Sequence, residues 1–162
     1  MVILSYNFDE IKVIPAQKEN ETHKKGVWKV FNENIGVNII THEPVPYEKH
    51  CKWWENVFEK EYVYIIQYQS IVCGYIRLTK IESNSKEKNV ISISLVKKCQ
   101  SVGIGTHAHN LFEDKMKEIG VTQFVAFTVM SNKIGQKFFE KNKYLLTGLD
   151  EVKNFKRYVK DL

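Results

Sequence analysis

The sequence is short of cysteine and of long apolar runs, and both shortages exclude whole classes of protein. Its three cysteines, Cys51, Cys73 and Cys99, include no Cys-x-x-Cys pair, which argues against a disulfide scaffold and a structural zinc site. We place Cys51 and Cys73 in the core and expect Cys99 to be partly exposed. No apolar run approaches the roughly 20 residues of a membrane-spanning helix, and the beginning of the chain lacks the basic stretch of a signal peptide. We therefore expect a cytoplasmic protein with no membrane partner and no metal.

Arginine is also scarce, because Arg77 and Arg157 are the only two in the chain. The formal net charge is nevertheless +5, and the lysines spread from Lys12 to Lys160 without a dense block. Proteins that read base edges favour the bidentate arginine fork, so this pattern argues against a nucleic-acid partner. An anionic small molecule explains the positive charge more simply.

What is present is the composition of a globular protein. Of 162 residues, 43% are hydrophobic and 27% are charged, so we expect one domain over residues 1–162. The order of expected elements, β-α-α-β-β-β-α-β-α-β-β, predicts a mixed-sheet α/β or α+β fold. Apolar periodicity and turn residues predict strands at 11–14, 62–68, 71–78, 90–96, 123–129, 144–148 and 155–159, and helices at 19–34, at 47–58, between Gly105 and Gly120, and after a cap at Ser131 or Asn132.

The most informative segment joins the apolar run 90–96 to Gln100-Ser101-Val102-Gly103-Ile104-Gly105-Thr106. A strand, a glycine loop and a helix in this order turn several backbone N–H groups and the positive end of a helix dipole toward one point. We therefore expect a cofactor that carries phosphate. The pattern is not that of a nucleotide hydrolase, because Gly105 is followed by Thr106-His107 instead of Lys-Ser/Thr, and a dinucleotide fold would need a third glycine.

In this element order, the glycine loop resembles that of the GNAT superfamily of acyl-CoA-dependent N-acetyltransferases. The segment Gln100–Gly105 matches the family's Arg/Gln-x-x-Gly-x-Gly/Ala, and Asn132, Gly135, Phe139 and Tyr144 fall on the Asn-x-x-Ala-x-x-x-Tyr-x-x-x-x-Phe pattern of its last helix. The resemblance covers essentially the whole chain and is closest to the amino-sugar and small-amine branches. It implies a GNAT-like fold, with a mixed, mostly antiparallel central sheet flanked by helices.

The resemblance also implies acetyl-CoA as cosubstrate and no metal. A primary amine would attack the acetyl group directly, through a tetrahedral intermediate whose oxyanion accepts a bond from a backbone N–H near Leu95 or Val96. Asn132 would anchor the pantetheine arm, although a plain helix cap is the other reading of this residue. The residues implied in cofactor binding are Ile93, Ser94 and Leu95 through their backbone, Gln100, Ser101, Val102, Gly103, Ile104, Gly105 and Thr106 around the pyrophosphate, and Asn132 and Phe139.

The acid and the base of this chemistry are where the chain departs from the family. The frequent general acid, a tyrosine on the last helix, falls at Phe139, and the fourth and fifth strands offer no carboxylate as base. Either water transfers the protons or a residue outside the motifs does. We expect His42 and Glu43, in a proline-rich loop, as catalytic candidates, with solvated loop residues as the alternative. Weaker candidates are Glu82, Tyr144 and Tyr158, while His23 and His50 are expected at the surface.

The acceptor is predicted from aromatic residues near the expected site. Trp53 and Tyr75 could stack on a sugar or a nucleobase, which favours a nucleotide-linked amino sugar as substrate. A protein N-terminus or an amino acid is the alternative acceptor. Because both usual acid and base positions are lost, a non-catalytic acyl-CoA-binding or regulatory module is an alternative of another class. Family members are often dimers, so a homodimer is an expectation that no residue decides.

Overall fold

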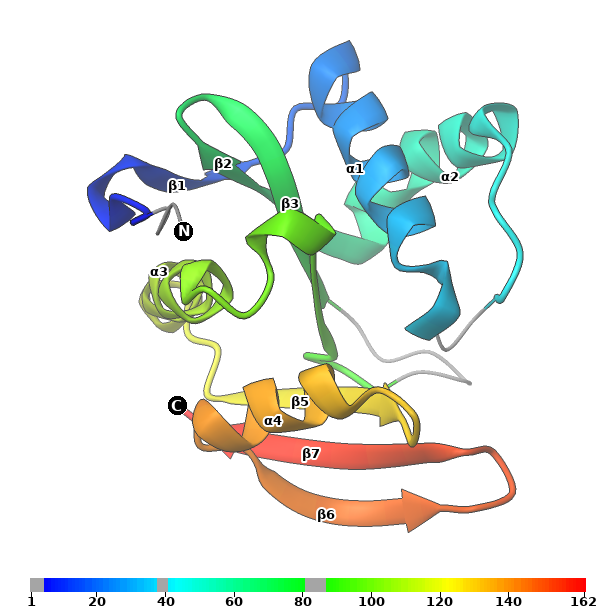
Figure 1. Ribbon diagram of the computed structural model, residues 1–162, viewed down its shortest axis with the longest axis vertical. Helices are drawn as coiled ribbons and strands as arrows, with labels where there is room; N and C mark the ends of the chain where they lie inside the picture. Colours follow the sequence, from blue (N-terminus) through cyan, green and yellow to red (C-terminus); the bar gives the residue numbers. More distant parts are fainter. Residues whose placement is uncertain (1–4, 38–40, 81–86) are drawn as a thin grey trace.

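The structure is a computed structural model, and it describes residues 5–37, 41–80 and 87–162. Strands β1 to β4 form one antiparallel sheet in chain order, and a second antiparallel sheet has the order β5-β7-β6 (Figure 1). The strands are β1 (Ile11–Pro15), β2 (Glu61–Tyr68), β3 (Ile71–Thr79), β4 (Ile91–Leu95), β5 (Gln123–Val129), β6 (Leu145–Asp150) and β7 (Phe155–Asp161). The helices are α1 (Glu21–Glu33), α2 (Tyr47–Lys60), α3 (Ile104–Glu118) and α4 (Lys133–Lys141), with short 3-10 turns at Phe8–Glu10, Ile35–Val37 and Lys97–Cys99.

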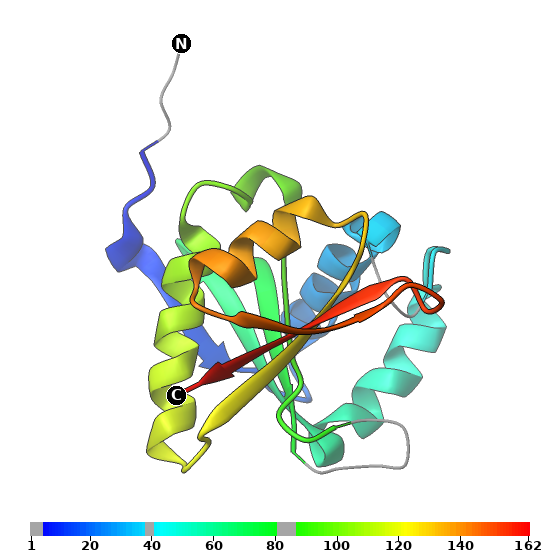
Figure 2. The same cartoon turned by 90° about the horizontal axis from the view of Figure 1, so that it is seen from below.

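The helices divide the molecule into layers. Helices α1 and α2 cover one face of the first sheet, and α3 lies on the other side, between this sheet and the second one (Figures 1 and 2). Helix α4 packs on the second sheet. The α1 and α2 layer is built around Trp54, which is fully buried, whereas the core beneath α3 contains Phe112 and Phe124 in stacked contact.

The two sheets touch at the beginning of β4 and separate toward its end. Val90 forms a parallel bridge with Val125, whose N–H donates to the carbonyl of Asn89 at 2.9 Å. Beyond this bridge, no pairing between β4 and β5 is found among the described residues. The last residues of β4 therefore present one edge that pairs with β3 and one open edge that faces β5.

The structure confirms the expected mixed α+β fold, with mostly antiparallel strands flanked by helices. Two expectations about single residue types are wrong. His23 and His50 are 4% and 5% exposed instead of lying at the surface, because α1 and α2 pack together and backbone groups of Gln17 and Lys24 contact the two rings. Cys99 is 4% exposed and belongs to the core, whereas Cys51, which was expected in the core, is only partly buried. Within the described ranges, no helix is long and apolar enough to cross a membrane.

Candidate functional site

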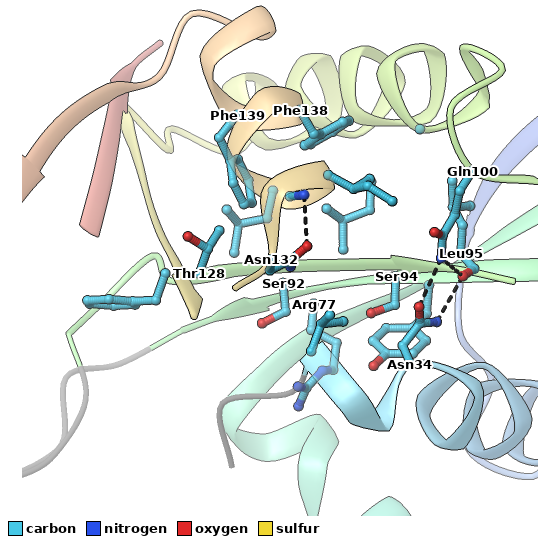
Figure 3. Close-up of a pocket in the computed structure, with 18 of the residues that line it drawn as sticks. Asn34, Arg77, Ser92, Ser94, Leu95, Gln100, Thr128, Asn132, Phe138 and Phe139 are labelled. Atoms are coloured by element: carbon cyan, nitrogen blue, oxygen red, sulfur yellow. Dashed lines mark hydrogen bonds between the residues drawn. The ribbon is translucent and has the colours of Figure 1, made fainter. Parts of the chain in front are cut away.

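A cavity of about 1270 Å³ lies where the two sheets separate (Figure 3). Its walls come from β3, β4, β5, the glycine loop, the beginning of α4 and the end of α1. We call the part beside the glycine loop the loop side and the part beside α1 and β3 the α1 side. The residues predicted from the sequence that line it are Tyr75, Ile93, Ser94, Leu95, Gln100, Ser101, Gly103, Gly105, Thr106, Asn132 and Phe139.

The open edge of β4 offers backbone hydrogen-bonding groups to the cavity. The N–H of Val96 donates to the carbonyl of Cys73 at 2.9 Å, and the N–H of Thr79 donates to that of Val90 at 3.1 Å. Hydrogen-bonded pairs alternate along an antiparallel ladder, so Ser92 and Ser94 also turn their backbone groups toward β3. The N–H and C=O groups of Ile93 and Leu95 consequently point away from β3, toward the cavity.

This register changes two of the sequence-based predictions. Ser94 pairs with Tyr75, so its backbone is not available to a ligand and only its side chain lines the cavity. The N–H of Val96 is already bonded to Cys73, which leaves Leu95 as the oxyanion donor of the two considered. The backbone roles of Ile93 and Leu95 stay predictions that this geometry permits.

The carbonyl of Leu95 is held by two side chains from different elements. The Asn34 amide at the end of α1 donates to it at 2.9 Å, and so does the Gln100 amide (Figure 3). Gln100 also donates to the Asn34 side-chain oxygen at 2.9 Å. Gln100 therefore fixes the end of β4 instead of lying free for a ligand. Asn34 was missed in the sequence, because nothing local shows that the end of α1 reaches β4.

The glycine loop is shaped for close approach by a ligand. Gly103, which precedes α3, has a φ of 90°, and Ser101 before it has a φ of 59°. The first N–H with a helical acceptor is that of His107, which donates to the carbonyl of Gly103 at 3.1 Å. The N–H groups of 101–106 precede this bond and lie at the positive end of the helix dipole. This arrangement fits a phosphate group.

The charge and packing around the loop fit the same kind of ligand. A Cβ atom on Gly105 would lie 3.3 Å from both Leu95 and Phe138, so the glycine lets the helix approach β4 closely. Four lysines line the cavity and attract anions to it, namely Lys97, Lys137, Lys141 and Lys153. Of the remaining predicted loop residues, the side chain of Val102 is 41% exposed and that of Ile104 is fully buried, and neither lines the cavity, which leaves only their backbone N–H groups for a ligand.

Helix α4 contributes a cap and a phenyl ring. The Asn132 side-chain oxygen accepts from the N–H of Gly135 at 2.9 Å, which confirms the helix-cap reading, and contact with a ligand stays a prediction. Phe139 lines the cavity and packs against Tyr144 and Tyr158, with ring centroids at 4.9 and 5.9 Å. Both tyrosines are buried, which raises the pKa of each hydroxyl, and neither lines the cavity. Glu82, the other weak candidate, lies outside the described residues.

His42 and Glu43 lie in the proline-rich loop between α1 and α2, away from the residues that line the cavity. Both side chains are exposed, and neither is among the residues that line the cavity. Their loop is fixed against α1, because the Val45 carbonyl accepts from Trp28 at 2.6 Å and from Asn32 at 3.0 Å. The prediction that they are catalytic is therefore not supported by their position.

The α1 side of the cavity holds an ion pair that the sequence did not reveal. Arg77 on β3 donates to Glu61, the first residue of β2, at 3.1 Å. The Trp53 ring lies against the Arg77 guanidinium at 5.2 Å and does not line the cavity, and Tyr75 lines it but is only 2% exposed. The stacking role predicted for these two rings stays a prediction, which the place of Trp53 outside the cavity lining and the small exposed surface of Tyr75 do not support.

The comparisons with known proteins agree with this geometry. The model of the acetyltransferase (GNAT) family matches residues 27–144, whereas a search of curated proteins gave no match. An N-acetyltransferase from Staphylococcus aureus Mu50 superposes with a TM-score of 0.75 at 18% identity, covering 93% of this chain and 98% of that one.

Two further solved structures are similar to nearly the whole chain. A ribosomal-protein-alanine N-acetyltransferase from Brucella melitensis has a TM-score of 0.75 at 15% identity, over 93% of this chain and 99% of that one. The putative acetyltransferase yncA from Salmonella typhimurium, solved with acetyl-CoA, has a TM-score of 0.70 at 14% identity, over 94% of this chain and 92% of that one. At such identities the superpositions show the shared fold alone. Because the family model spans more than half of its length, the chain belongs to the acetyltransferase (GNAT) family.

Proposed function

We propose that this chain transfers the acetyl group of acetyl-CoA to a primary amine of a small molecule. The observation that carries the proposal is the open edge of β4 next to the glycine loop. The pantetheine arm contains two amide groups, and an extended ligand of this kind can add to a strand edge such as that of Ile93 and Leu95. The N–H groups of 101–106 stand beside this edge for the pyrophosphate.

Leu95 has the central role in the proposed chemistry. Acetyl-CoA supplies a thioester, and transfer makes a carbon–nitrogen bond, breaks the carbon–sulfur bond and moves one proton from the amine to the thiol. The Leu95 N–H can stabilise negative charge on the acetyl oxygen. Asn34 and Gln100 hold the carbonyl of the same residue, so the strand end is fixed before the substrate binds. Phe139 has no proton to donate. We therefore assign to water in the cavity both the removal of the proton from the amine and its delivery to the departing thiolate.

The acceptor is proposed at the level of a small amine, with a nucleotide-linked amino sugar as the finer proposal. Stacking of Trp53 on a sugar ring gives this finer proposal little support, because Trp53 does not line the cavity. The positive charge of the cavity still suits a sugar phosphate. An amino acid or a protein N-terminus is the second candidate, and the Brucella melitensis protein, described as a ribosomal-protein-alanine N-acetyltransferase, gives a precedent on the same fold.

We also propose a cytoplasmic enzyme, in keeping with three cysteines that are all free thiols. A homodimer stays a prediction. The exposed leucines of the edge strand β6, Leu145, Leu146 and Leu149, are where such an interface could form.

Thiol-release kinetics test the proposed function. Acetyl-CoA is mixed with amino-sugar nucleotides, amino acids and peptides, and free coenzyme A thiol is measured with and without enzyme. We expect release that depends on one class of amine. Tight binding of coenzyme A without release across the whole panel would contradict turnover and would favour the non-catalytic binding module.

A further inference from the structure

We propose that the acceptor amine carries an anionic group, a carboxylate or a phosphate, which Arg77 binds while Glu61 holds the guanidinium in place. The inference rests on the proposed function and adds the class of acceptor to it.

The position of Arg77 suits a group that holds the acceptor. Arg77 lines the α1 side of the cavity, on the face of the first sheet that also carries Tyr75 and Thr79. It lies opposite Ser92, three residues before Leu95 on β4. At about 3.3 Å per residue, the two positions are about 10 Å apart along the strand. A small molecule can therefore reach from the guanidinium to the acetyl group expected at Leu95.

The guanidinium has hydrogen-bond donors to spare. Its side chain is 13% exposed, and Glu61 accepts from Nη1 alone, at 3.1 Å. Nε is buried and has no partner in the described part of the chain. The ring centroids of Trp53 and Tyr75 lie 5.2 and 5.7 Å from the guanidinium carbon. The faces of these rings do not accept a conventional hydrogen bond from Nε. A buried donor without a partner is unfavourable, so a ligand that accepts from this edge would be favoured.

The other arginine of the chain shows what a purely structural pair looks like here. Arg157 donates to both carboxylate oxygens of Glu87, at 3.0 and 2.7 Å, and to the Thr147 hydroxyl at 2.8 Å. Its Nε, Nη1 and Nη2 atoms are all engaged. Arg77 instead keeps the planar Nε and Nη2 edge, which matches the two oxygens of a carboxylate or a phosphate.

Glu61 positions the guanidinium. It is 8% exposed and lies beside Arg77, so it restricts the guanidinium to one position before a ligand arrives. Because this ion pair already balances the charge of Arg77, recognition of the ligand rests on the geometry of the remaining Nε and Nη2 donors.

The test compares paired acceptors with wild-type protein and with Arg77→Lys, which keeps the charge but loses the planar fork. The pairs are alanine with alaninamide and glucosamine 6-phosphate with glucosamine. Dividing each variant value by the wild-type value cancels differences in amine basicity. We expect KM to rise about 10- to 100-fold for the acceptor with the anionic group and to stay within about twofold for its neutral counterpart and for acetyl-CoA. The pair that shows the loss identifies the group as carboxylate or phosphate.

Two more variants complete the design. Arg157→Lys is the matched control, since it makes the same change in an ion pair whose arginine does not line the cavity, and it should leave every KM within about twofold. The double variant Glu61→Gln with Arg77→Gln removes both charges, so neither is left buried without its partner and the fold should be kept. A loss of its preference for anionic amines therefore cannot be attributed to unfolding. Equal losses for anionic and neutral amines, no loss in Arg77→Lys, or the same loss in Arg157→Lys would each overturn the inference.

Binding without turnover separates this inference from the proposed function. Melting temperatures are measured with coenzyme A alone and with coenzyme A plus each amine. An additional rise with one of the anionic amines, absent in Arg77→Lys, supports the role of Arg77. Stabilisation by coenzyme A with no such rise overturns the inference while leaving the cofactor site in place. No stabilisation by coenzyme A overturns the proposed function itself.

Discussion

Gly103 is the single residue on which the shape of the glycine loop depends most. Its φ of 90° is a left-handed conformation, and a Cβ atom there would lie 2.9 Å from the Phe8 ring. An alanine at this position must therefore either move the loop or displace Phe8. Both changes disturb the N–H groups that we assign to the pyrophosphate.

We expect Gly103→Ala to raise KM for acetyl-CoA about tenfold or more and to lower the free energy of unfolding by about 1–2 kcal/mol. The matched control is Gly120→Ala, because Gly120 also has a positive φ, of 87°, but no atom within 4 Å of its Cβ position. The control should lose similar stability with KM unchanged. Steady-state kinetics and urea unfolding of both variants give the comparison, and equal KM values for Gly103→Ala and the wild type would count against the phosphate role.

Single residues also show how far sequence reasoning reaches. Asn132 could be predicted as a cap because its partner, Gly135, is three residues away. The Glu61 and Arg77 pair could not, because the two residues are 16 positions apart and meet only through the register of β2 with β3. His42 was predicted from its chemistry and from its place in the proline-rich loop, and the contacts that fix this loop against α1 are equally non-local.

Among the elements, α3 is joined to the following segments by a buried polar cluster. His109 on α3 is fully buried and contacts the Tyr144 hydroxyl at 2.7 Å through Nε2. Burial, reinforced by the charge of Lys160 and opposed by that of Glu113, lowers the pKa of His109 to about 4. Although burial acts against it, bonds from Lys117 and Lys160 hold the pKa of Glu113 below its ordinary value. The folded protein therefore keeps His109 neutral.

This cluster predicts a loss of stability in mild acid. Above a pH of about 6.5, His109 is neutral in both the folded and the unfolded state. Between a pH of about 6.5 and about 4, it is protonated in the unfolded chain but stays neutral in the folded protein. The expected contribution is a fall of about 2 kcal/mol in the free energy of unfolding by pH 5. His109→Gln should be less stable near neutral pH but should lack this part of the slope. Urea unfolding between pH 7.5 and 5 checks it, and parallel curves for the two proteins would refute the assignment.

The elements themselves could largely be predicted, and their edges could not. The strand and helix order followed from local periodicity, caps and turn residues, and these are encoded within a few positions of each other. The open edge of β4 is defined instead by where pairing with β5 stops after Val90, which no local pattern shows. For the same reason, the backbone of Ser94 was assigned to the ligand, although the register gives it to Tyr75.

At the scale of the whole molecule, the two sheets and their helices bring the donor site and the acceptor site that we propose into one cavity. The loop side carries the glycine loop, the α1 side carries Arg77 and Glu61, and four lysines are among the residues that line the cavity. The end of β4 has one open edge toward the cavity, so the N–H of Leu95 can face the reacting group from that edge (Figure 3). Family membership explains why this architecture exists, whereas the acceptor depends on side chains particular to this chain.

The central claim is that this cavity binds coenzyme A, and the unfolding of the wild-type protein with and without coenzyme A tests it most directly. At about 100 times its dissociation constant, a ligand that binds only the folded state adds about 2.7 kcal/mol to the free energy of unfolding. For a chain of this length, that corresponds to a rise in melting temperature of about 5–11 °C. We expect this rise in the wild type and a smaller one in Gly103→Ala at the same concentration. An unchanged melting temperature at millimolar coenzyme A would contradict the claim.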